Sequence, residues 1–129
     1  MLTTTVSGLA SGGYDIYLVY RTWNYPGYYG WGEIQAAISG QPLVQYDETS
    51  GTDTGYSSWA GYEYIRQVKL GTLSGITSFS VDVDDTPAVN GDTVYSGVAY
   101  EQVIPEPSAL LALGIGLAGL TGFAVRKRK

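Results

Sequence analysis

Neither cysteine nor histidine occurs anywhere in this chain of 129 residues. Their absence excludes disulfide bonds, thiolate chemistry, Ser-His and Cys-His nucleophile pairs, and the usual zinc sites. Enzymatic chemistry would have to rest on carboxylates or on a metal held by oxygen atoms. Twelve acidic residues are present, but the sequence marks out no acid and base pair, which needs separated pKa values and a cleft. We therefore expect no enzymatic activity.

Positive charge is scarce before the last four residues. The chain has 12 acidic and 7 basic residues, a formal net charge of −5, and four of the bases are Arg126, Lys127, Arg128 and Lys129. Residues 1–107 therefore hold 3 bases against 12 acids, a net charge of −9. A body this acidic repels nucleic acid and anionic lipid headgroups, so we expect neither as a partner.

The long apolar run of the sequence lies at its C-terminus. Pro105, Glu106 and Pro107 precede residues 108–125, which carry no charge, and the basic cluster 126–129 follows. A helix over 108–125 would span about 27 Å, close to the roughly 30 Å of a hydrocarbon core. The sequence thus predicts one transmembrane helix. By the positive-inside rule its basic end is cytoplasmic and the body lies outside.

In this order the three parts resemble the PEP-CTERM sorting signal of Gram-negative and related bacteria. The resemblance rests on Pro105, Glu106 and Pro107, the span from Ser108 to Val125, and the cluster Arg126 to Lys129. It implies export, transient insertion in the inner membrane, and cleavage near the tripeptide by an exosortase, a membrane-embedded transpeptidase-like enzyme. It also implies a link to extracellular polysaccharide or biofilm. A permanent single-pass anchor and a buried helix are the alternatives for the same segment.

Such a signal also implies a signal peptide at the other end of the protein. Residues 1–6 have no basic region, no apolar stretch of about 7 to 15 residues and no small-residue cleavage site. We therefore expect the sequence to start late, at an internal methionine, so that the domain is truncated at its N-terminus. Insertion of the tail after synthesis is the alternative.

Residues 1–104 predict a single all-β domain, with the sorting signal at 105–129. Apolar residues alternate along 14–20 and 76–83 with the period of two of a strand, and glycine-rich turns separate the segments. The predicted strands are 3–6, 14–20, 33–38, 43–46, 62–70, 76–83 and 94–104, with a loop at 47–58 and a tight connection at 84–92. This pattern is typical of an antiparallel β-sandwich or jelly roll. Residues 6–20 are also similar to a sandwich strand common in exported proteins with this tail.

Aromatic residues gather in one glycine- and proline-rich stretch and one later position. Sugar rings stack their apolar faces on such side chains, so they form a candidate glycan platform, although sandwich cores and loops use aromatics too. The candidate residues are Trp23, Tyr25, Tyr28, Tyr29, Trp31 and Trp59.

Acidic residues gather around the predicted connection at 84–92. Calcium takes six to eight oxygen ligands, and the candidate ligands are Asp82, Asp84, Asp85 and Asp92. The alternative is a solvated turn whose acids cap backbone amides. We thus expect no obligatory cofactor, with Ca²⁺ as an open possibility.

The sequence as a whole indicates how the protein is delivered more clearly than what it does afterwards. We expect an exported, non-catalytic surface or extracellular-matrix protein that an exosortase sorts. Its partners would be exosortase, the membrane and extracellular polysaccharide. The alternative is a carbohydrate-binding β-sandwich module on a permanent single-pass anchor.

Overall fold

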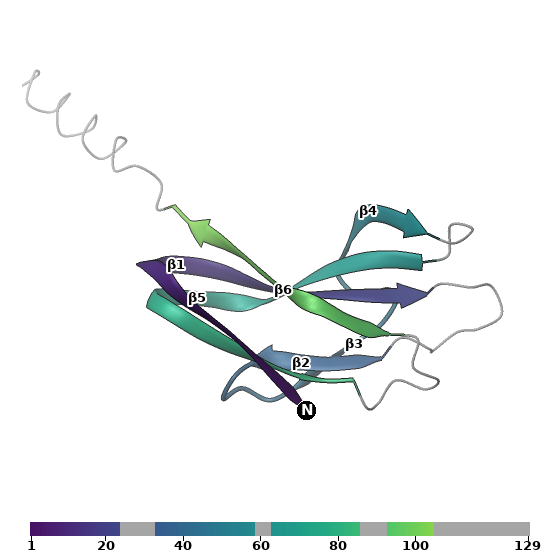
Figure 1. Cartoon of the computed structure of the whole chain (residues 1–129), viewed down its shortest axis with the longest axis horizontal. Helices are drawn as coiled ribbons and strands as arrows, with labels where there is room; N and C mark the ends of the chain where they lie inside the picture. The colour runs from purple at the N-terminus through teal and green to yellow at the C-terminus, as the bar shows by residue number, and fades with distance from the viewer. Residues whose placement is uncertain (24–32, 59–62, 86–92, 105–129) are drawn as a thin grey trace, which may run out of the picture.

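A computed structural model describes residues 1–23, 33–58, 63–85 and 93–104. Its strands are β1 (Leu2–Trp23), β2 (Ile34–Ile38), β3 (Val44–Tyr46), β4 (Thr52–Ser58), β5 (Glu63–Asp84) and β6 (Val94–Val103). They form one antiparallel sheet in the order β3-β2-β5-β1-β6, and β4 also pairs with β5 (Figure 1). The prediction of an all-β antiparallel body is confirmed.

Within the described parts of the chain, no helix has the length and apolar character needed to cross a membrane. The predicted membrane helix at 108–125 and the sorting signal around it lie outside these parts, so they stay predictions as structural elements.

The strands β1 and β5 are each 22 residues long and pair along nearly their whole length. In Figure 1 the two strands turn back together at the left of the view. Their register shifts between Ser7 and Gly12 and again between Gly12 and Tyr14. The first half of β1 then lies in one layer with the end of β5 and β2. The second half lies in the other layer with the start of β5, β4 and β6. One continuous sheet therefore supplies both layers of a sandwich-like body.

The inner faces of the two layers form the hydrophobic core. One layer contributes Tyr14, Ile16, Leu18 and Tyr20 from β1, and the other contributes Ile34, Ala36, Ile38, Phe79, Val81 and Val83 from β2 and β5. The predicted period of two is confirmed, because the residues between these positions in β1 are only partly buried. Two hydrogen bonds also cross between layers: Tyr95 donates to Thr4 Oγ1 (2.6 Å), and Tyr20 donates to the carbonyl of Asp47 (2.7 Å). Burial raises the pKa of Tyr20 to about 12.

Two predicted chain breaks are wrong. Residues 3–6 and 14–20 belong to one strand, and so do 63–70 and 76–83. The sequence predicts glycine-rich turns between these segments, but Gly8 and Gly75, with φ of 77° and 67°, lie in the bent ribbon without ending it. Glycine accepts such backbone angles at little cost, and bulges bend a strand while its ladder continues.

The predicted loop at 47–58 is wrong in its second part, since Thr52–Ser58 forms β4. Its first part is a turn. The carboxylate of Asp47 accepts hydrogen bonds from the Thr49 amide (2.8 Å), the Thr49 hydroxyl (2.7 Å) and the Ser50 hydroxyl (2.9 Å). The hydroxyl bond from Thr49 is the main cause that lowers the pKa of Asp47. Polar composition concealed β4 because residues 52–55 are exposed, and within the described sheet this strand pairs with β5 alone.

Candidate functional site

The C-terminal end of β6 is the point where the body meets the predicted sorting signal. Within the described sheet β6 pairs with β1 alone, and its last pair joins Val103 to Gly13. Val103 is 41% exposed and Ile104 80%. Pro105 comes next and has no backbone donor to continue the ladder. The sequence therefore leaves the sheet at an edge strand, on the protein surface.

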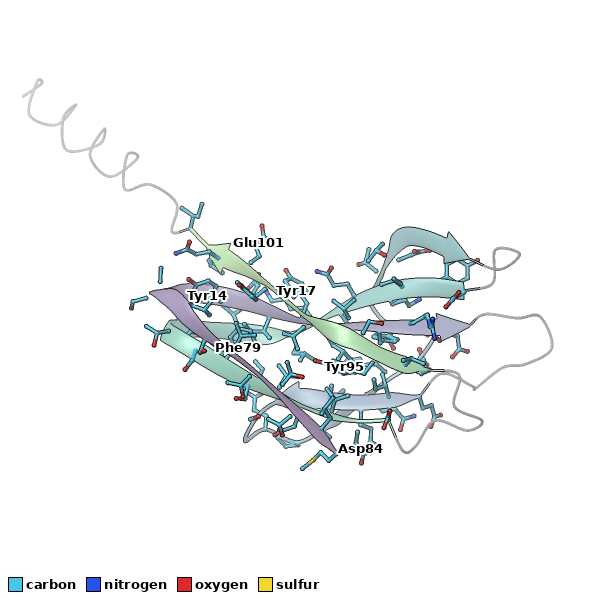
Figure 2. All side chains as sticks on the ribbon, in the orientation of Figure 1. Tyr14, Tyr17, Phe79, Asp84, Tyr95 and Glu101 are labelled. Atoms are coloured by element: carbon cyan, nitrogen blue, oxygen red, sulfur yellow. The ribbon has the colours of Figure 1, made fainter. Side chains whose placement is uncertain are left out.

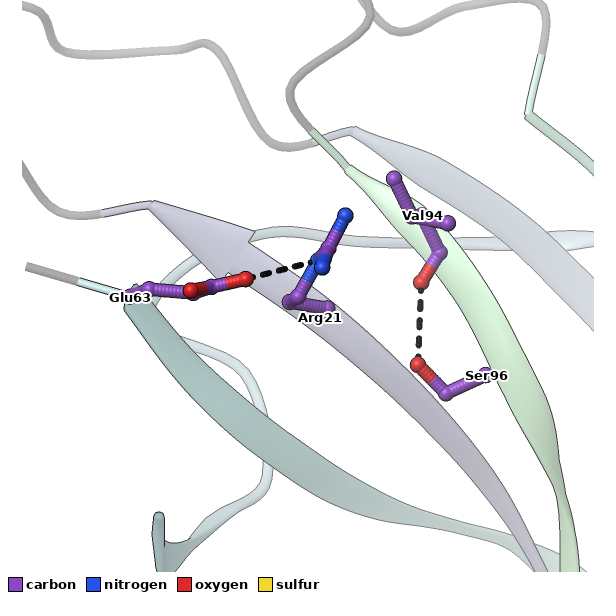
Figure 3. A network of polar contacts seen from close by, with 4 residues as sticks. All are labelled: Arg21, Glu63, Val94 and Ser96. Atoms are coloured by element: carbon purple, nitrogen blue, oxygen red, sulfur yellow. Dashed lines mark hydrogen bonds and ion pairs between the residues drawn. The ribbon is translucent and has the colours of Figure 1, made fainter. Parts of the chain in front are cut away.

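The strand ends that flank the predicted aromatic site lie together at the opposite end of the sheet. Both Trp23 and Ser58 pair with Glu63 through the backbone, and Val94 pairs with Arg21 nearby. Figure 3 shows Arg21 Nε in contact with the Glu63 carboxylate at 2.8 Å, beside the start of β6, where Ser96 donates to the Val94 carbonyl (3.4 Å). Glu63 is only 5% exposed.

The other predicted glycan-binding residues, Tyr25, Tyr28, Tyr29, Trp31 and Trp59, lie outside the described residues. For Trp23 the structure defines the backbone only. The glycan platform therefore stays a prediction, and only the strand ends that flank it are described.

The acidic residues proposed as calcium ligands are described only in part. Asp82 lies on the outer face of β5 and accepts a hydrogen bond from the Thr3 hydroxyl (2.7 Å). Asp84 ends β5 and Asp85 is exposed, while Asp92 lies outside the described residues. Among the residues that the structure describes, no group of three or more acidic side chains is arranged to hold a metal ion. The calcium site therefore stays a prediction, because Asp92 lies outside the described residues.

A groove that the sequence did not indicate lies on the outer face of the second layer. It has a volume of about 480 Å³ and is lined by Tyr17 of β1, Gln67 and Lys69 of β5, and residues 51–54 at the start of β4. Figure 2 labels Tyr17, which lies opposite Lys69 in the β1–β5 register. These residues are far apart in sequence, and no motif connects them.

An ion pair borders this groove. Lys69 Nζ lies 2.7 Å from the Asp15 carboxylate, and the Thr72 hydroxyl donates to the same carboxylate at 2.6 Å. The hydrogen bond from Lys69 is the largest cause that lowers the pKa of Asp15, followed by the one from Thr72. The same bond raises the pKa of Lys69. Lys69 therefore stays charged while its charge is balanced by Asp15.

Comparison with known families gives one match, which lies in the C-terminal segment of the chain. The family model described as the PEP-CTERM protein-sorting motif matches residues 103–129. The chain carries a PEP-CTERM sorting motif. The match begins at the last residue of β6, so the PEP-CTERM segment directly follows the exposed end of the sheet. No match to the chain was found among curated proteins or among solved structures.

The PEP-CTERM match covers the tripeptide Pro105, Glu106 and Pro107 and the basic cluster Arg126 to Lys129, as the resemblance in sequence predicted. It implies exosortase as the processing partner and membrane-associated sorting to the cell surface. It covers nothing of the body before residue 103, so the role of the sheet has to be argued from its own geometry.

Proposed function

We propose that this protein is an exported, non-catalytic surface or extracellular-matrix protein that exosortase releases from a temporary membrane anchor. The observation that carries the proposal is the PEP-CTERM match at residues 103–129, which starts where β6 ends. In this scheme 108–125 spans the inner membrane, 126–129 lies in the cytoplasm, and the sheet lies outside.

The geometry of the junction supports processing near 105–107. Ile104 is exposed, and β6 ends one residue earlier at an edge of the described sheet. A membrane-embedded enzyme would reach the tripeptide without opening the core, because the chain leaves the sheet at the end of an edge strand, at the exposed residues Val103 and Ile104. Cleavage would therefore release the sheet intact.

The composition supports a role outside the cell without catalysis. The body lacks cysteine and histidine and carries a net charge of −9 over residues 1–107. Such a charge keeps a protein soluble and prevents adhesion to anionic membranes after release. A matrix of extracellular polysaccharide, as in a biofilm, is the environment we propose for the mature protein.

The test is the intact mass of the protein recovered from its native host, with membrane and released fractions measured separately. We expect a released form that lacks everything beyond the region from Pro105 to Ser108. Replacing 105–107 by three alanines should keep the full-length mass in the membrane. Glu101→Ala, which changes an exposed glutamate in β6, is the matched control and should be processed normally. A full-length wild-type protein retained in the membrane would make the tail a permanent anchor.

A second candidate function, carbohydrate binding by the aromatic residues, is favoured by one observation. The backbones of Trp23 and Ser58 both pair with Glu63, so the strands that lead into the two aromatic segments end on either side of the start of β5. The test is to compare the binding of the host's exported glycans by wild type and by Trp23→Ala. Identical binding curves would reject the platform.

We include no cofactor in this proposal. Calcium at Asp82, Asp84, Asp85 and Asp92 is the alternative, and calorimetry without heat at millimolar Ca²⁺ would dispose of it.

A further inference from the structure

The groove on the outer face is separate from the end of the sheet that carries the predicted aromatic platform. Tyr17 lies six positions before Trp23 on β1, which corresponds to about 20 Å along a strand. The groove has a volume of about 480 Å³, which falls within the range of roughly 300 to 1,000 Å³ that is typical of small-molecule sites. Among the described residues, those that line the groove are different from the ones that the sequence singled out.

One wall of the groove is fixed by a close backbone approach. At Gly51 the φ angle is 69°, and a Cβ atom added there would lie 2.3 Å from the carbonyl oxygen of Gln67. The hydrogen-bonded turn at Asp47 and Ser50 leads into this contact, and the Arg66 guanidinium donates to the Ser50 carbonyl (3.3 Å). The start of β4 is thus held directly against β5, and the groove is already formed without a ligand.

The groove combines an aromatic ring with spare hydrogen-bonding capacity of both kinds. Asp53 uses one carboxylate oxygen to accept from the Gly55 amide (2.8 Å), and a carboxylate accepts about four hydrogen bonds. The ammonium group of Lys69 has three N–H donors, of which the Asp15 pair occupies one. The amide of Gln67 both donates and accepts. These groups suit a ligand with many hydroxyl groups.

Charge decides between neutral and ionic ligands. The positive charge of Lys69, which lines the groove, is balanced by Asp15, and Asp53 adds a negative charge on the opposite wall. An acidic ligand would meet this carboxylate and the net charge of −9 of residues 1–107, so it would be repelled. A neutral ligand avoids this repulsion and can still accept and donate hydrogen bonds.

We propose that this groove binds a neutral oligosaccharide segment, with one sugar ring stacked on Tyr17 and its hydroxyl groups hydrogen-bonded to Gln67 and Asp53. This inference rests on the proposed function, since a protein released into a polysaccharide matrix meets such ligands. It concerns a step after sorting, so the masses of the membrane and released forms test one proposal and glycan titration tests the other.

The test is calorimetric titration of the full chain in detergent micelles with neutral oligosaccharides based on glucose, xylose and mannose. An oligogalacturonate serves as the anionic probe. We expect saturable binding of at least one neutral probe and weaker binding of the anion. Tyr17→Ala should weaken the neutral complex about tenfold, and Tyr17→Phe, which keeps the ring, should stay within about twofold.

Gln67→Ala provides a second variant that does not alter the ring, and should weaken binding about fivefold through one lost hydrogen bond. Gln45→Ala on β3 removes an exposed glutamine elsewhere in the sheet and should leave binding unchanged. Thermal unfolding of each variant shows whether it is folded. If Tyr17→Ala fails to fold, Gln67→Ala decides alone. The proposal is overturned if no neutral probe binds, or if binding survives both groove variants; loss of that binding in Trp59→Ala would then assign it to the aromatic residues instead.

Discussion

The two halves of β1 have the same partner strand but very different surroundings. The second half carries four buried residues on one face, including Ile16 and Leu18 at 0% exposure, and pairs with β5 on one side and β6 on the other. Among the strands that the structure describes, the first half pairs with β5 alone, and its outer face carries hydroxyl groups such as that of Thr5, which lies 2.8 Å from the hydroxyl of Ser80.

This difference indicates that the second half of β1 contributes more to the stability of the fold than the first half. The second half is held from two sides and from the core, so its outer face is a rigid base. Residues of a binding site are positioned best on such elements. Tyr17, which lines the groove, lies on that base, and Lys69 pairs with it from β5.

The largest expected effect comes from core substitution in the second half of β1. Ile16→Ala should lower the free energy of unfolding by about 2 to 5 kcal/mol, because it leaves a cavity among fully buried neighbours. Thr5→Ala, also at a β-branched position of β1, should cost under about 1 kcal/mol. Chemical denaturation of both variants measures the difference. Equal losses would show that the two halves contribute equally to stability.

The alternation of apolar residues made the second half of β1 predictable from the sequence. Residues 14–20 have one apolar face, and the structure buries that face. The bend was not predictable, because Gly12 and Gly13 look the same in a turn and in an irregular strand. Only the pairing of Gly12 with Ile76 shows that the ladder resumes there. Tertiary pairing likewise determined β4, whose threonine, aspartate and glycine residues are typical of loops.

The sorting motif and the groove also differ in whether they can be predicted from the sequence. The motif is contiguous, so its tripeptide, apolar span and basic cluster could be found by reading along the chain. The groove is assembled from Tyr17, Asp53 and Gln67 on three strands. No spacing in the sequence relates these residues, and only the register between strands brings them together.

An intermediate effect is expected at the wall of the groove. Gly51 and Gly55 both have positive φ, 69° and 79°, but only Gly51 approaches other backbone atoms. Alanine at either position costs roughly 1 to 2 kcal/mol for the left-handed conformation. Gly51→Ala should cost about 1 to 3 kcal/mol more, because its methyl group would overlap Gln67. Thermal unfolding of Gly51→Ala and Gly55→Ala measures the two losses of stability. Equal losses would show that β4 is not held tightly against β5.

The smallest expected effect concerns the ion pair beside the groove. The bonds from Lys69 and Thr72 hold the pKa of Asp15 below its ordinary value. Because the folded-state pKa is depressed, the associated stability is present above the unfolded pKa of about 4 and is lost as the pH falls through the folded value. Thr72→Val removes the hydroxyl donor while keeping the shape of the side chain. It should raise the pKa of Asp15 and reduce the loss of stability in acid.

Carboxyl NMR between about pH 2 and 6 measures the pKa of Asp15, which should stay unchanged in Thr77→Val, a variant at an exposed threonine of β5. Solvent screens an exposed pair, so the stability change should be much smaller than for Ile16→Ala. An unshifted pKa in Thr72→Val would show that Lys69 alone sets the charge of Asp15. The outer face would then owe its order to the sheet beneath it rather than to its own hydrogen bonds.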